Sequence, residues 1–326
     1  MTEHVVIGVD SGGTSTRCAV VTRGGQVLAH GRAGGGNQYS SADPAGAFES
    51  VLRAALADAG DITVDAAVFG VSGASVGDAT AVRTVTDAWK ALGLPGTPYV
   101  TDDIAIAFAA GSAAEAGTVL VAGTGAVAAY VRDGAVARRC DGYGWLLGDE
   151  GSAVWIALAG LRAALASIDG RGRPTVLAER LAAALESTPG DTQSLVRAAY
   201  ARPPAELGEL APDVAAAATD GDTVAREIVA DAAERLLTNL ATVAPDPLGA
   251  DPVVFAGALL SAGPVADAVR EGLRTRHGTT PRVAVDGALG AAGLALRRSG
   301  APESVHARLL EPLGKASDPR AGGGLR

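Results

Sequence analysis

Residues 6–21 read VIGVDSGGTSTRCAVV, in which two apolar runs flank a polar centre rich in glycine. The runs VIGV and CAVV have the composition of buried strands, and DSGGTSTR between them has no large apolar residue. A turn of glycine and threonine exposes consecutive backbone N–H groups, with no Cβ to keep an anion away. The stretch therefore predicts two strands joined by a turn that binds an anion through Gly12, Gly13 and Thr14.

The same plan returns in residues 118–136, which read TVLVAGTGAVAAYVRDGAV. Here the residues of the turn are Gly123, Thr124 and Gly125. A second pair of segments also matches, because AAVFGVSGAS at 66–75 and PVVFAGALLSAG at 252–263 both read as buried strands that run into loops of small residues. The alternation of strands with helical segments predicts an α/β chain built from two similar lobes.

The two halves differ in what they contain besides this plan. Residues at about 151–245 have apolar side chains at helical spacing, as in VLAERLAAALE and DTVAREIVADAAERLLTNLATV. We expect a first lobe at 1–115 and a second lobe at 116–298 that carries this helical insertion. An extension at 299–326 follows, and its tail ASDPRAGGGLR is expected to be disordered.

Composition limits the partners of the 326-residue chain. Its formal net charge is −9 and it has only two lysines, Lys90 and Lys315, so it lacks the basic stripe that nucleic acid requires. Cys18 and Cys140 form no disulfide or metal-binding pattern. No apolar run reaches the length of a membrane span or a signal segment, so we expect a cytoplasmic protein without a membrane partner. A homodimer is compatible with the sequence.

Two matching turns, one in each lobe, could face each other across a cleft and clamp a chain of phosphates. The chain has no GxxxxGK[ST] motif, which excludes a P-loop protein. Because lysine is nearly absent, backbone donors and a divalent cation must balance the phosphate charge. Asp10, at a strand end before the first turn, is suited to hold Mg²⁺ directly or through water. The competing interpretation is that both turns are simple tight hairpins.

Two further stretches carry carboxylates next to predicted helices. In YVTDDIAIAFAAG at 99–111, a strand leads through Asp102 and Asp103 into a helix, a position that holds a carboxylate rigidly. Such a group suits the acceptance of a proton from an attacking hydroxyl, and the alternative is that it only caps the helix.

The second stretch is DGYGWLLGDEGSAVWIA at 141–157, where Asp149 and Glu150 lie in a glycine-bounded loop beside Tyr143 and Trp145. Carboxylates accept hydrogen bonds from vicinal hydroxyls, and an aromatic face packs on a sugar ring or an acetyl methyl. For Glu150, capping of the following helix is an equally good interpretation.

These motifs resemble a known family. VDSGGTSTRCAVV and VLVAGTGAVAAYV look like the two phosphate motifs of the actin/Hsp70/sugar-kinase superfamily, and VVFAGALLSAG is similar to its adenosine motif. More narrowly, the chain to about residue 298 resembles the N-acetylglucosamine kinase and BadF/BadG/BcrA/BcrD ATPase group, and GDEGSAVWI resembles the signature of the amino-sugar kinases. The resemblance implies two actin-like (ribonuclease H-like) lobes around a central nucleotide cleft, with Gly257 and Ala258 at the nucleotide.

The resemblance also implies roles for single residues on the acceptor side. It selects Asp103 as the catalytic base, with Asp102 standing where an uncharged residue is usual. It assigns the sugar hydroxyls to Asp149 and the wall of an N-acetyl pocket to Tyr143. In the loop GGGNQYS, Asn37 stands where the family binds the sugar.

The expected function is therefore an ATP-dependent amino-sugar kinase that uses Mg²⁺ and phosphorylates the 6-hydroxyl of N-acetylglucosamine. Glucosamine and N-acetylmuramic acid remain alternative acceptors. An ATPase that activates a radical dehydratase is disfavoured, because such proteins hold an iron–sulfur cluster and neither Cys18 nor Cys140 lies in a suitable motif. An actin-like or Hsp70-like assembly module is also disfavoured, because it would need a large partner surface or a peptide-binding domain.

Overall fold

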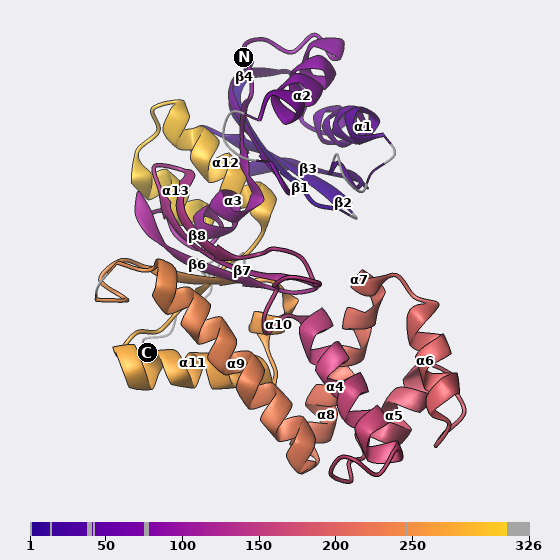
Figure 1. The fold of residues 1–326 in the computed structure, drawn as a ribbon. Coiled ribbons are helices and arrows are strands. Elements are labelled where there is room, and N and C mark those ends of the chain that lie inside the picture. Colours follow the sequence, from indigo (N-terminus) through magenta and orange to yellow (C-terminus); the bar gives the residue numbers. More distant parts are fainter. Residues whose placement is uncertain are drawn as a thin grey trace, which may run out of the picture.

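A computed structural model of the chain describes residues 2–13, 15–37, 41, 43–74, 78–245 and 247–311. They form two lobes, each with a five-stranded sheet, and a group of helices extends from the second lobe (Figure 1). The first lobe contains β1 (Glu3–Ser11), β2 (Ser15–Thr22), β3 (Val27–Gly34), α1 (Pro44–Ala57), β4 (Ile62–Val71), α2 (Ala79–Ala91), β5 (Tyr99–Asp102) and α3 (Asp103–Ala109). The second sheet and its flanking helices are β6 (Ala116–Ala122), β7 (Ala126–Arg132), β8 (Ala135–Asp141), β9 (Val253–Ala256), α10 (Ala258–Ser261), α11 (Pro264–His277) and β10 (Arg282–Val283).

The two sheets have the same topology. Their strand orders are β3-β2-β1-β4-β5 and β8-β7-β6-β9-β10. In each, the first three strands of the chain segment pair antiparallel, and β4 or β9 then joins the first of them in parallel. The predicted repeat of strand, glycine turn and strand is therefore confirmed, as is the α/β fold class.

The helical insertion is also confirmed. It consists of α4 (Ala153–Ile168), α5 (Leu177–Ala184), α6 (Thr192–Tyr200), α7 (Pro204–Leu207), the 3₁₀ turn η1 (Gly208–Leu210), α8 (Ala211–Thr219) and α9 (Thr223–Val243). The long helix α9 buries apolar side chains such as Leu236 and Leu240 against the second sheet, and it ends two residues before Pro245.

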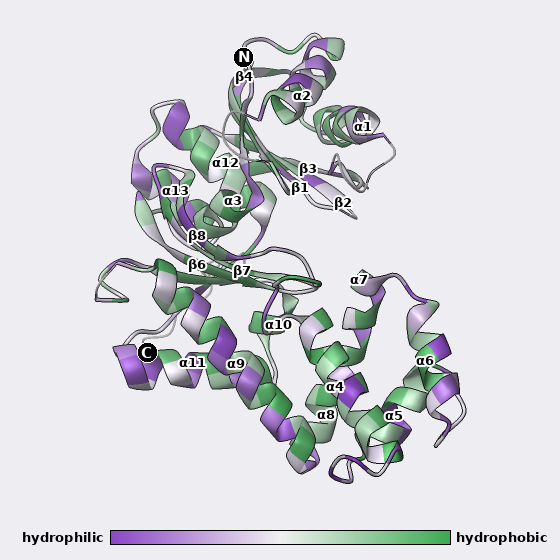
Figure 2. Cartoon of the chain, viewed as in Figure 1, coloured by the Kyte–Doolittle hydropathy of each residue, from purple (hydrophilic) through white to green (hydrophobic). Residues whose placement is uncertain are grey.

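Helices cover both faces of each sheet, and α3 lies between the two sheets. Its residues Ile106 and Ala109 belong to the core on the first sheet, whereas Ile104 and Phe108 belong to the core on the second. Figure 2 shows hydrophobic residues along the strands of both sheets and hydrophilic residues on α9 and α11. Packing on both faces fixes the start of α3, and with it Asp103, at the junction of the lobes.

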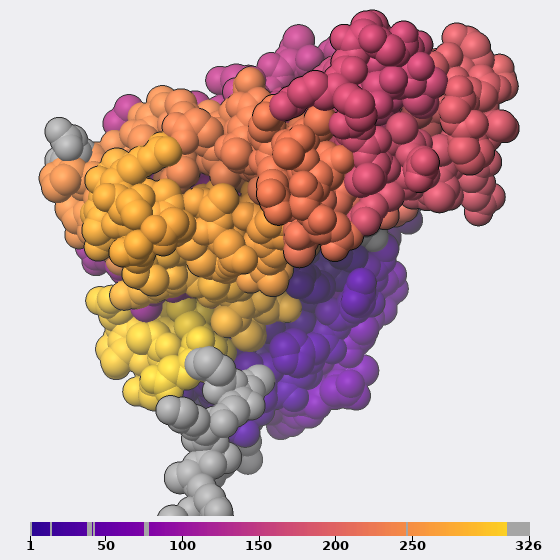
Figure 3. Space-filling view, turned by 90° about the horizontal axis from the view of Figure 1, so that it is seen from below, coloured from indigo at the N-terminus to yellow at the C-terminus, as the bar shows by residue number. Residues whose placement is uncertain are grey.

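The chain returns to the first lobe near its end. The predicted second lobe runs to residue 298, but α12 (Gly287–Arg298) packs on β1 and β4 of the first sheet, and α13 (Glu303–Leu309) follows it. Contact is so close that a Cβ on Gly8 of β1 would lie 2.2 Å from the carbonyl oxygen of Ala288. Figure 3 shows these yellow helices against the indigo first lobe.

Two other expectations concern the C-terminal tail and membrane-spanning helices. The tail predicted to be disordered, residues 316–326, lies outside the described residues. Within the described part, no helix combines the length and the hydrophobicity that crossing a bilayer demands.

Candidate active site

A cavity of about 730 Å³ opens between the two lobes. The ends of β1 and β5, the β6–β7 turn, the start of α3 and the segment after β9 all contribute to its wall. The predicted site residues that line it are Asp10, Asp103, Gly123, Thr124, Gly125, Asp149, Gly257 and Ala258. Five other predicted residues are described but do not line it: Gly12, Gly13, Asn37, Tyr143 and Glu150. Thr14 lies outside the described residues.

The two adjacent aspartates at the start of α3 have separate tasks. Asp102 caps the helix, since its Oδ1 accepts a hydrogen bond of 2.8 Å from the backbone N–H of Ile104. Asp103 is the first helical residue, and both aspartates line the cavity. The capping role considered for this pair therefore belongs to Asp102.

The environment of Asp103 shifts its proton affinity. Burial, and next the negative charge of Asp102, raise the pKa of the Asp103 carboxyl from 3.8 to about 7. A hydrogen bond from Ser72 and the charge of Arg139 act in the opposite direction. A carboxylate with a pKa near neutral pH is well matched to take a proton from a hydroxyl group.

Hydrogen bonds through Ser72 connect Asn37 to the Asp103 carboxylate. The side-chain N–H of Asn37 donates a hydrogen bond of 2.9 Å to the carbonyl oxygen of Ser72, whose side chain bonds to Asp103. In the same loop, the backbone N–H of Gly36 donates to the carbonyl oxygen of Gly12 at 3.2 Å. The loop that contains Asn37 is thereby attached both to the first glycine turn and to the surroundings of Asp103. Ser72 had no predicted role.

The first turn is tight, because the backbone N–H of Gly12 donates to the carbonyl oxygen of Ser15 at 3.0 Å. Asp10, just before it on β1, accepts a hydrogen bond of 2.5 Å from Arg17, and Arg17 also reaches Asp286 at 3.3 Å. Burial raises the pKa of Asp10, and the guanidinium of Arg17 opposes this. Arg17 lines the cavity, although the sequence analysis assigned it no role.

The donor set at Asp10 can be compared with the needs of Mg²⁺. The described residues contain no group of three or more His, Cys, Asp or Glu arranged for a metal ion. Mg²⁺ does not need such a group, because it commonly binds one or two carboxylates together with phosphate oxygens and water. Asp10 and Asp286, which share the guanidinium of Arg17, fit that requirement.

The second turn adjoins the start of the helical insertion. The N–H of Gly123 donates to the carbonyl oxygen of Gly125 at 2.9 Å, and the N–H of Ala153 in α4 donates to the carbonyl oxygen of Gly123 at 2.9 Å. A Cβ on Gly125 would lie 2.7 Å from Oδ2 of Asp149, so this carboxylate touches the turn. Burial raises the pKa of Asp149, and the hydrogen bond from the N–H of Gly144 opposes this.

Glu150 and Tyr143 do not line the cavity. Ser152 caps α4, since its hydroxyl oxygen accepts a hydrogen bond of 3.2 Å from the N–H of Trp155, so the capping interpretation of Glu150 is wrong. The carboxylate of Glu150 instead accepts a hydrogen bond of 2.6 Å from Arg235 of α9. Tyr143 is 66% exposed.

Arg139 is a second cationic residue of the cavity, although the sequence favours a solvated turn for Arg138 and Arg139. It lies on β8, where successive side chains alternate between the two faces. Its guanidinium lines the cavity and donates to the carbonyl oxygen of Gly142 at 2.5 Å, whereas Arg138 donates to the carbonyl oxygen of Thr242 at 2.9 Å. Because side chains alternate between the two faces of a strand, only one of two neighbouring arginines on β8 can face the cavity, and this alternation was the signal in the sequence.

A second cavity, of about 630 Å³, adjoins the first, and Gly123, Thr124 and Ala258 line both. Its remaining wall comes from the start of α4, the segment from α7 to α8, and the region of α10 and α11. Gly257 lies at the junction with φ at +94°, and a Cβ there would lie 2.2 Å from the carbonyl oxygen of Ala122. The stretch that resembles an adenosine motif thus connects the two cavities.

A sequence model of the BadF/BadG/BcrA/BcrD ATPase family matches residues 7–295. The chain belongs to this family. The match confirms the resemblance drawn from the two glycine turns and the stretch around Gly257.

Curated relatives of this BadF/BadG/BcrA/BcrD ATPase family member are sugar kinases. It is 26% identical over 242 residues to the N-acetylmuramic acid/N-acetylglucosamine kinase of Clostridium acetobutylicum, covering 73% of this chain and 78% of that protein. It is 27% identical over 253 residues to the N-acetyl-D-glucosamine kinase of Dictyostelium discoideum, covering 72% and 78%. The names of these proteins agree with the predicted enzyme class.

A solved structure supports the fold of the family member. The crystal structure of the putative N-acetylglucosamine kinase from Chromobacterium violaceum matches with a TM-score of 0.69 and 25% identity, covering 90% of this chain and 99% of that one. The predicted pair of actin-like lobes is thereby confirmed.

Proposed function

We propose that the chain is an ATP-dependent amino-sugar kinase that transfers the γ-phosphate of ATP to the 6-hydroxyl of N-acetylglucosamine. The observation that carries the proposal is Asp103, a carboxylate with its pKa raised to about 7 in a cavity that also contains the second glycine turn. The family and the names of the relatives support the same reaction class.

On the acceptor side, the 6-hydroxyl donates a hydrogen bond to Asp103. As the new bond forms between this oxygen and the γ-phosphorus, the bond from the γ-phosphorus to the β–γ bridging oxygen breaks, ADP leaves, and the Asp103 carboxylate takes the hydroxyl proton. Asp149 accepts hydrogen bonds from other sugar hydroxyls, and Asn37 both donates and accepts, as its amide allows. Tyr143, exposed beside the loop of Asp149, packs on the acetyl group when the sugar is bound.

On the donor side, the phosphates lie between the two turns and meet their backbone N–H groups. The residues of these turns are Gly12, Gly13 and Thr14 in the first lobe and Gly123, Thr124 and Gly125 in the second. The adenosine occupies the second cavity beyond Gly257 and Ala258. Arg17 and Arg139 supply the positive charge that lysine supplies in many other nucleotide sites.

Mg²⁺ would be held by Asp10 and Asp286 together with the phosphates, and it would neutralise phosphate charge. Arg17 bridges these two carboxylates and so fixes their positions relative to each other. Closure of the lobes around both substrates excludes water, which favours transfer to the sugar over hydrolysis.

The test is ADP release by the purified protein with ATP, Mg²⁺ and a panel of N-acetylglucosamine, glucosamine, N-acetylmuramic acid and glucose. We expect N-acetylglucosamine to stimulate turnover most. Asp103→Asn should lower kcat by about 10²- to 10⁴-fold while ADP affinity stays unchanged, because the nucleotide turns lie on other elements. The proposal fails if no sugar stimulates ADP release, and the base assignment fails if the variant keeps full activity. Iron in the purified protein would favour the dehydratase activator instead.

A further inference from the structure

Asp141, the last residue of β8, has an unusual backbone conformation. Its φ is +65°, in the left-handed region that residues other than glycine rarely adopt, and its side chain is buried. It does not line either of the two cavities. A strained, buried aspartate outside the site requires surroundings that hold it in place.

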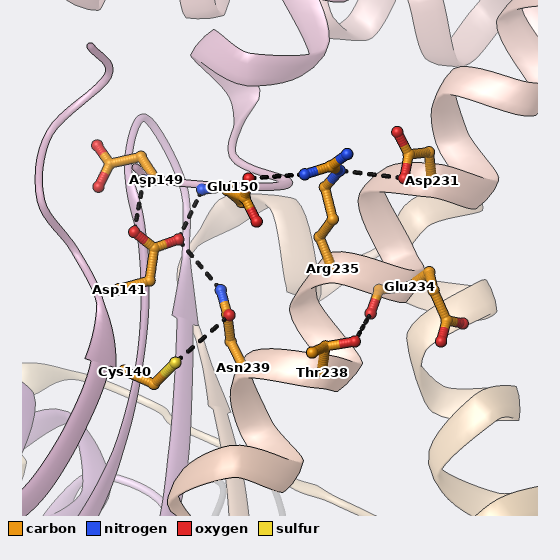
Figure 4. A network of polar contacts seen from close by, with 9 residues as sticks. All are labelled: Cys140, Asp141, Asp149, Glu150, Asp231, Glu234, Arg235, Thr238 and Asn239. Atoms are coloured by element: carbon orange, nitrogen blue, oxygen red, sulfur yellow. Dashed lines mark hydrogen bonds and ion pairs between the residues drawn. The ribbon is translucent and has the colours of Figure 1, made fainter. Parts of the chain in front are cut away.

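Four N–H groups hold the carboxylate of Asp141, and Figure 4 shows the bonds from Asp149, Glu150 and Asn239. Oδ1 accepts from the backbone N–H groups of Gly142 and Asp149, both at 2.8 Å. Oδ2 accepts from the backbone N–H of Glu150 at 2.7 Å and from the side-chain amide of Asn239 at 3.1 Å. Within the described part of the chain no ion pair involves this carboxylate, and all four of these hydrogen bonds come from amide N–H groups.

These bonds close the loop of residues 142–150 at both of its ends on one side chain. The loop packs so tightly around the carboxylate that a Cβ on Gly148 would lie 2.2 Å from Oδ1 of Asp141. Asp149 has a φ of +55°, so its backbone also lies in the left-handed region, which is unfavourable for residues other than glycine. With its N–H fixed, the carboxylate of Asp149 is directed to the second glycine turn at Gly125.

Helix α9 holds the same loop from the other side. Asn239 is buried, donates to Asp141 and accepts a weak hydrogen bond of 3.5 Å from the thiol of Cys140. One helical turn earlier, Arg235 binds the carboxylate of Glu150 at 2.6 Å. Two side chains on one face of α9 thus attach the loop to the helical insertion.

We propose that Asp141 is a positioning residue that holds Asp149 where the acceptor sugar binds. The hydrogen bond from Asn239 attaches Asp141 to α9. The inference rests on the proposed function, because it assigns the sugar hydroxyls to Asp149. Asparagine at position 141 would turn an N–H₂ group toward N–H donors and lose about half of the hydrogen bonds. The loop would then loosen without any change at Asp103.

The test compares Asp141→Asn with Asp222→Asn. Asp222 is a matched control, because its carboxylate likewise accepts backbone hydrogen bonds, from Val176 at 2.9 Å and Ala225 at 2.8 Å, but it lines neither cavity. We expect Asp141→Asn to raise the sugar KM by about tenfold or more, while the ATP KM and kcat stay within about twofold. Asp222→Asn should leave the KM values for both substrates unchanged even if both variants lower Tm.

Hydrogen exchange without ligand gives a readout that does not depend on the sugar. Backbone amides of residues 142–150 should exchange faster in Asp141→Asn and remain protected in Asp222→Asn. Native sugar KM and native exchange in Asp141→Asn, or an equal rise in both KM values, would overturn the inference. If the native protein phosphorylates no amino sugar, the proposed function fails, and exchange still reports whether Asp141 orders the loop.

A milder variant covers the case in which Asp141→Asn does not fold. Asn239→Ala removes one of the four donors and leaves the three backbone bonds intact. We expect a smaller rise in the sugar KM, with faster exchange in the same loop. Unchanged values of both would contradict the attachment to α9.

Discussion

The substitution Asp102→Asn should move the acidic limb of the activity profile to lower pH. Burial is the largest cause of the raised pKa of Asp103, and the charge of Asp102 is the next. Asparagine keeps a side-chain oxygen that can cap α3 at Ile104 but removes that charge. Burial remains in the variant, so the pKa of Asp103 should fall from about 7 without reaching the ordinary value of 3.8.

The size of the effect follows from the fraction of ionised base. Asp103 accepts a proton only as a carboxylate, so activity is lost as the pH falls through its pKa. With a pKa of about 7, about one tenth of the molecules are ionised at pH 6 and about one hundredth at pH 5. The first unit by which the pKa falls therefore raises the activity at pH 5, relative to the plateau, by about tenfold, and each further unit raises it by less.

The assay is kcat/KM for N-acetylglucosamine between about pH 5 and pH 9, since this ratio reports groups of the free enzyme. Asp43→Asn is the matched control, because Asp43 also caps a helix, at Gly46, and does not line the cavity. Its acidic limb should coincide with that of the native enzyme. A limb that stays in place in Asp102→Asn, or moves upward, would refute the electrostatic reasoning.

Three further predictions concern stability and nucleotide binding. Burial lowers the pKa of His306 from 6.5 to about 4, so the unfolded state binds more protons between these values. The free energy of unfolding should therefore fall by about 3 kcal/mol as the pH drops from 6.5 to about 4. His306→Gln should flatten this pH dependence in chemical denaturation, and an unchanged slope would exclude His306 as its cause. Gly257→Ala should weaken ATP binding in calorimetry by about 1–3 kcal/mol because of its positive φ and the contact with β6, whereas a native Kd would contradict this. Gly8→Ala should lower the free energy of unfolding by roughly 1–3 kcal/mol, because the added Cβ clashes with α12. Gly34→Ala is the control and should leave this free energy unchanged, because a Cβ at Gly34 has nothing within 4 Å. Equal free energies of unfolding for the two variants would be inconsistent with the packing described.

Local pattern was sufficient for the architecture of the two sheets. The apolar runs on either side of Gly12 and of Gly123 are strands because buried strands need continuous apolar residues and the turns need glycine. Since these signals lie within about 20 residues of sequence, they predicted both hairpins and their equivalence. The same applies to α9, whose helical spacing and terminal Pro245 lie in one segment.

Contacts between distant segments were beyond that reasoning. Glu150 reads as a helix cap from its neighbours, but its partner Arg235 lies 85 residues away on α9. The role of Asp141 depends on the same helix, through Asn239. The position of Arg139 in the cavity depends on which face of β8 is turned inward, which two adjacent arginines do not reveal.

The central claim is that the two glycine turns grip one nucleotide and present its terminal phosphate to a sugar at Asp103. The most direct measurement is a crystal structure with a non-hydrolysable ATP analogue, Mg²⁺ and N-acetylglucosamine. The account predicts phosphates between Gly12–Gly13 and Gly123–Gly125, with the sugar 6-hydroxyl within hydrogen-bonding distance of the Asp103 carboxylate. Phosphates bound away from either turn, or a sugar whose 6-hydroxyl points away from Asp103, would contradict it.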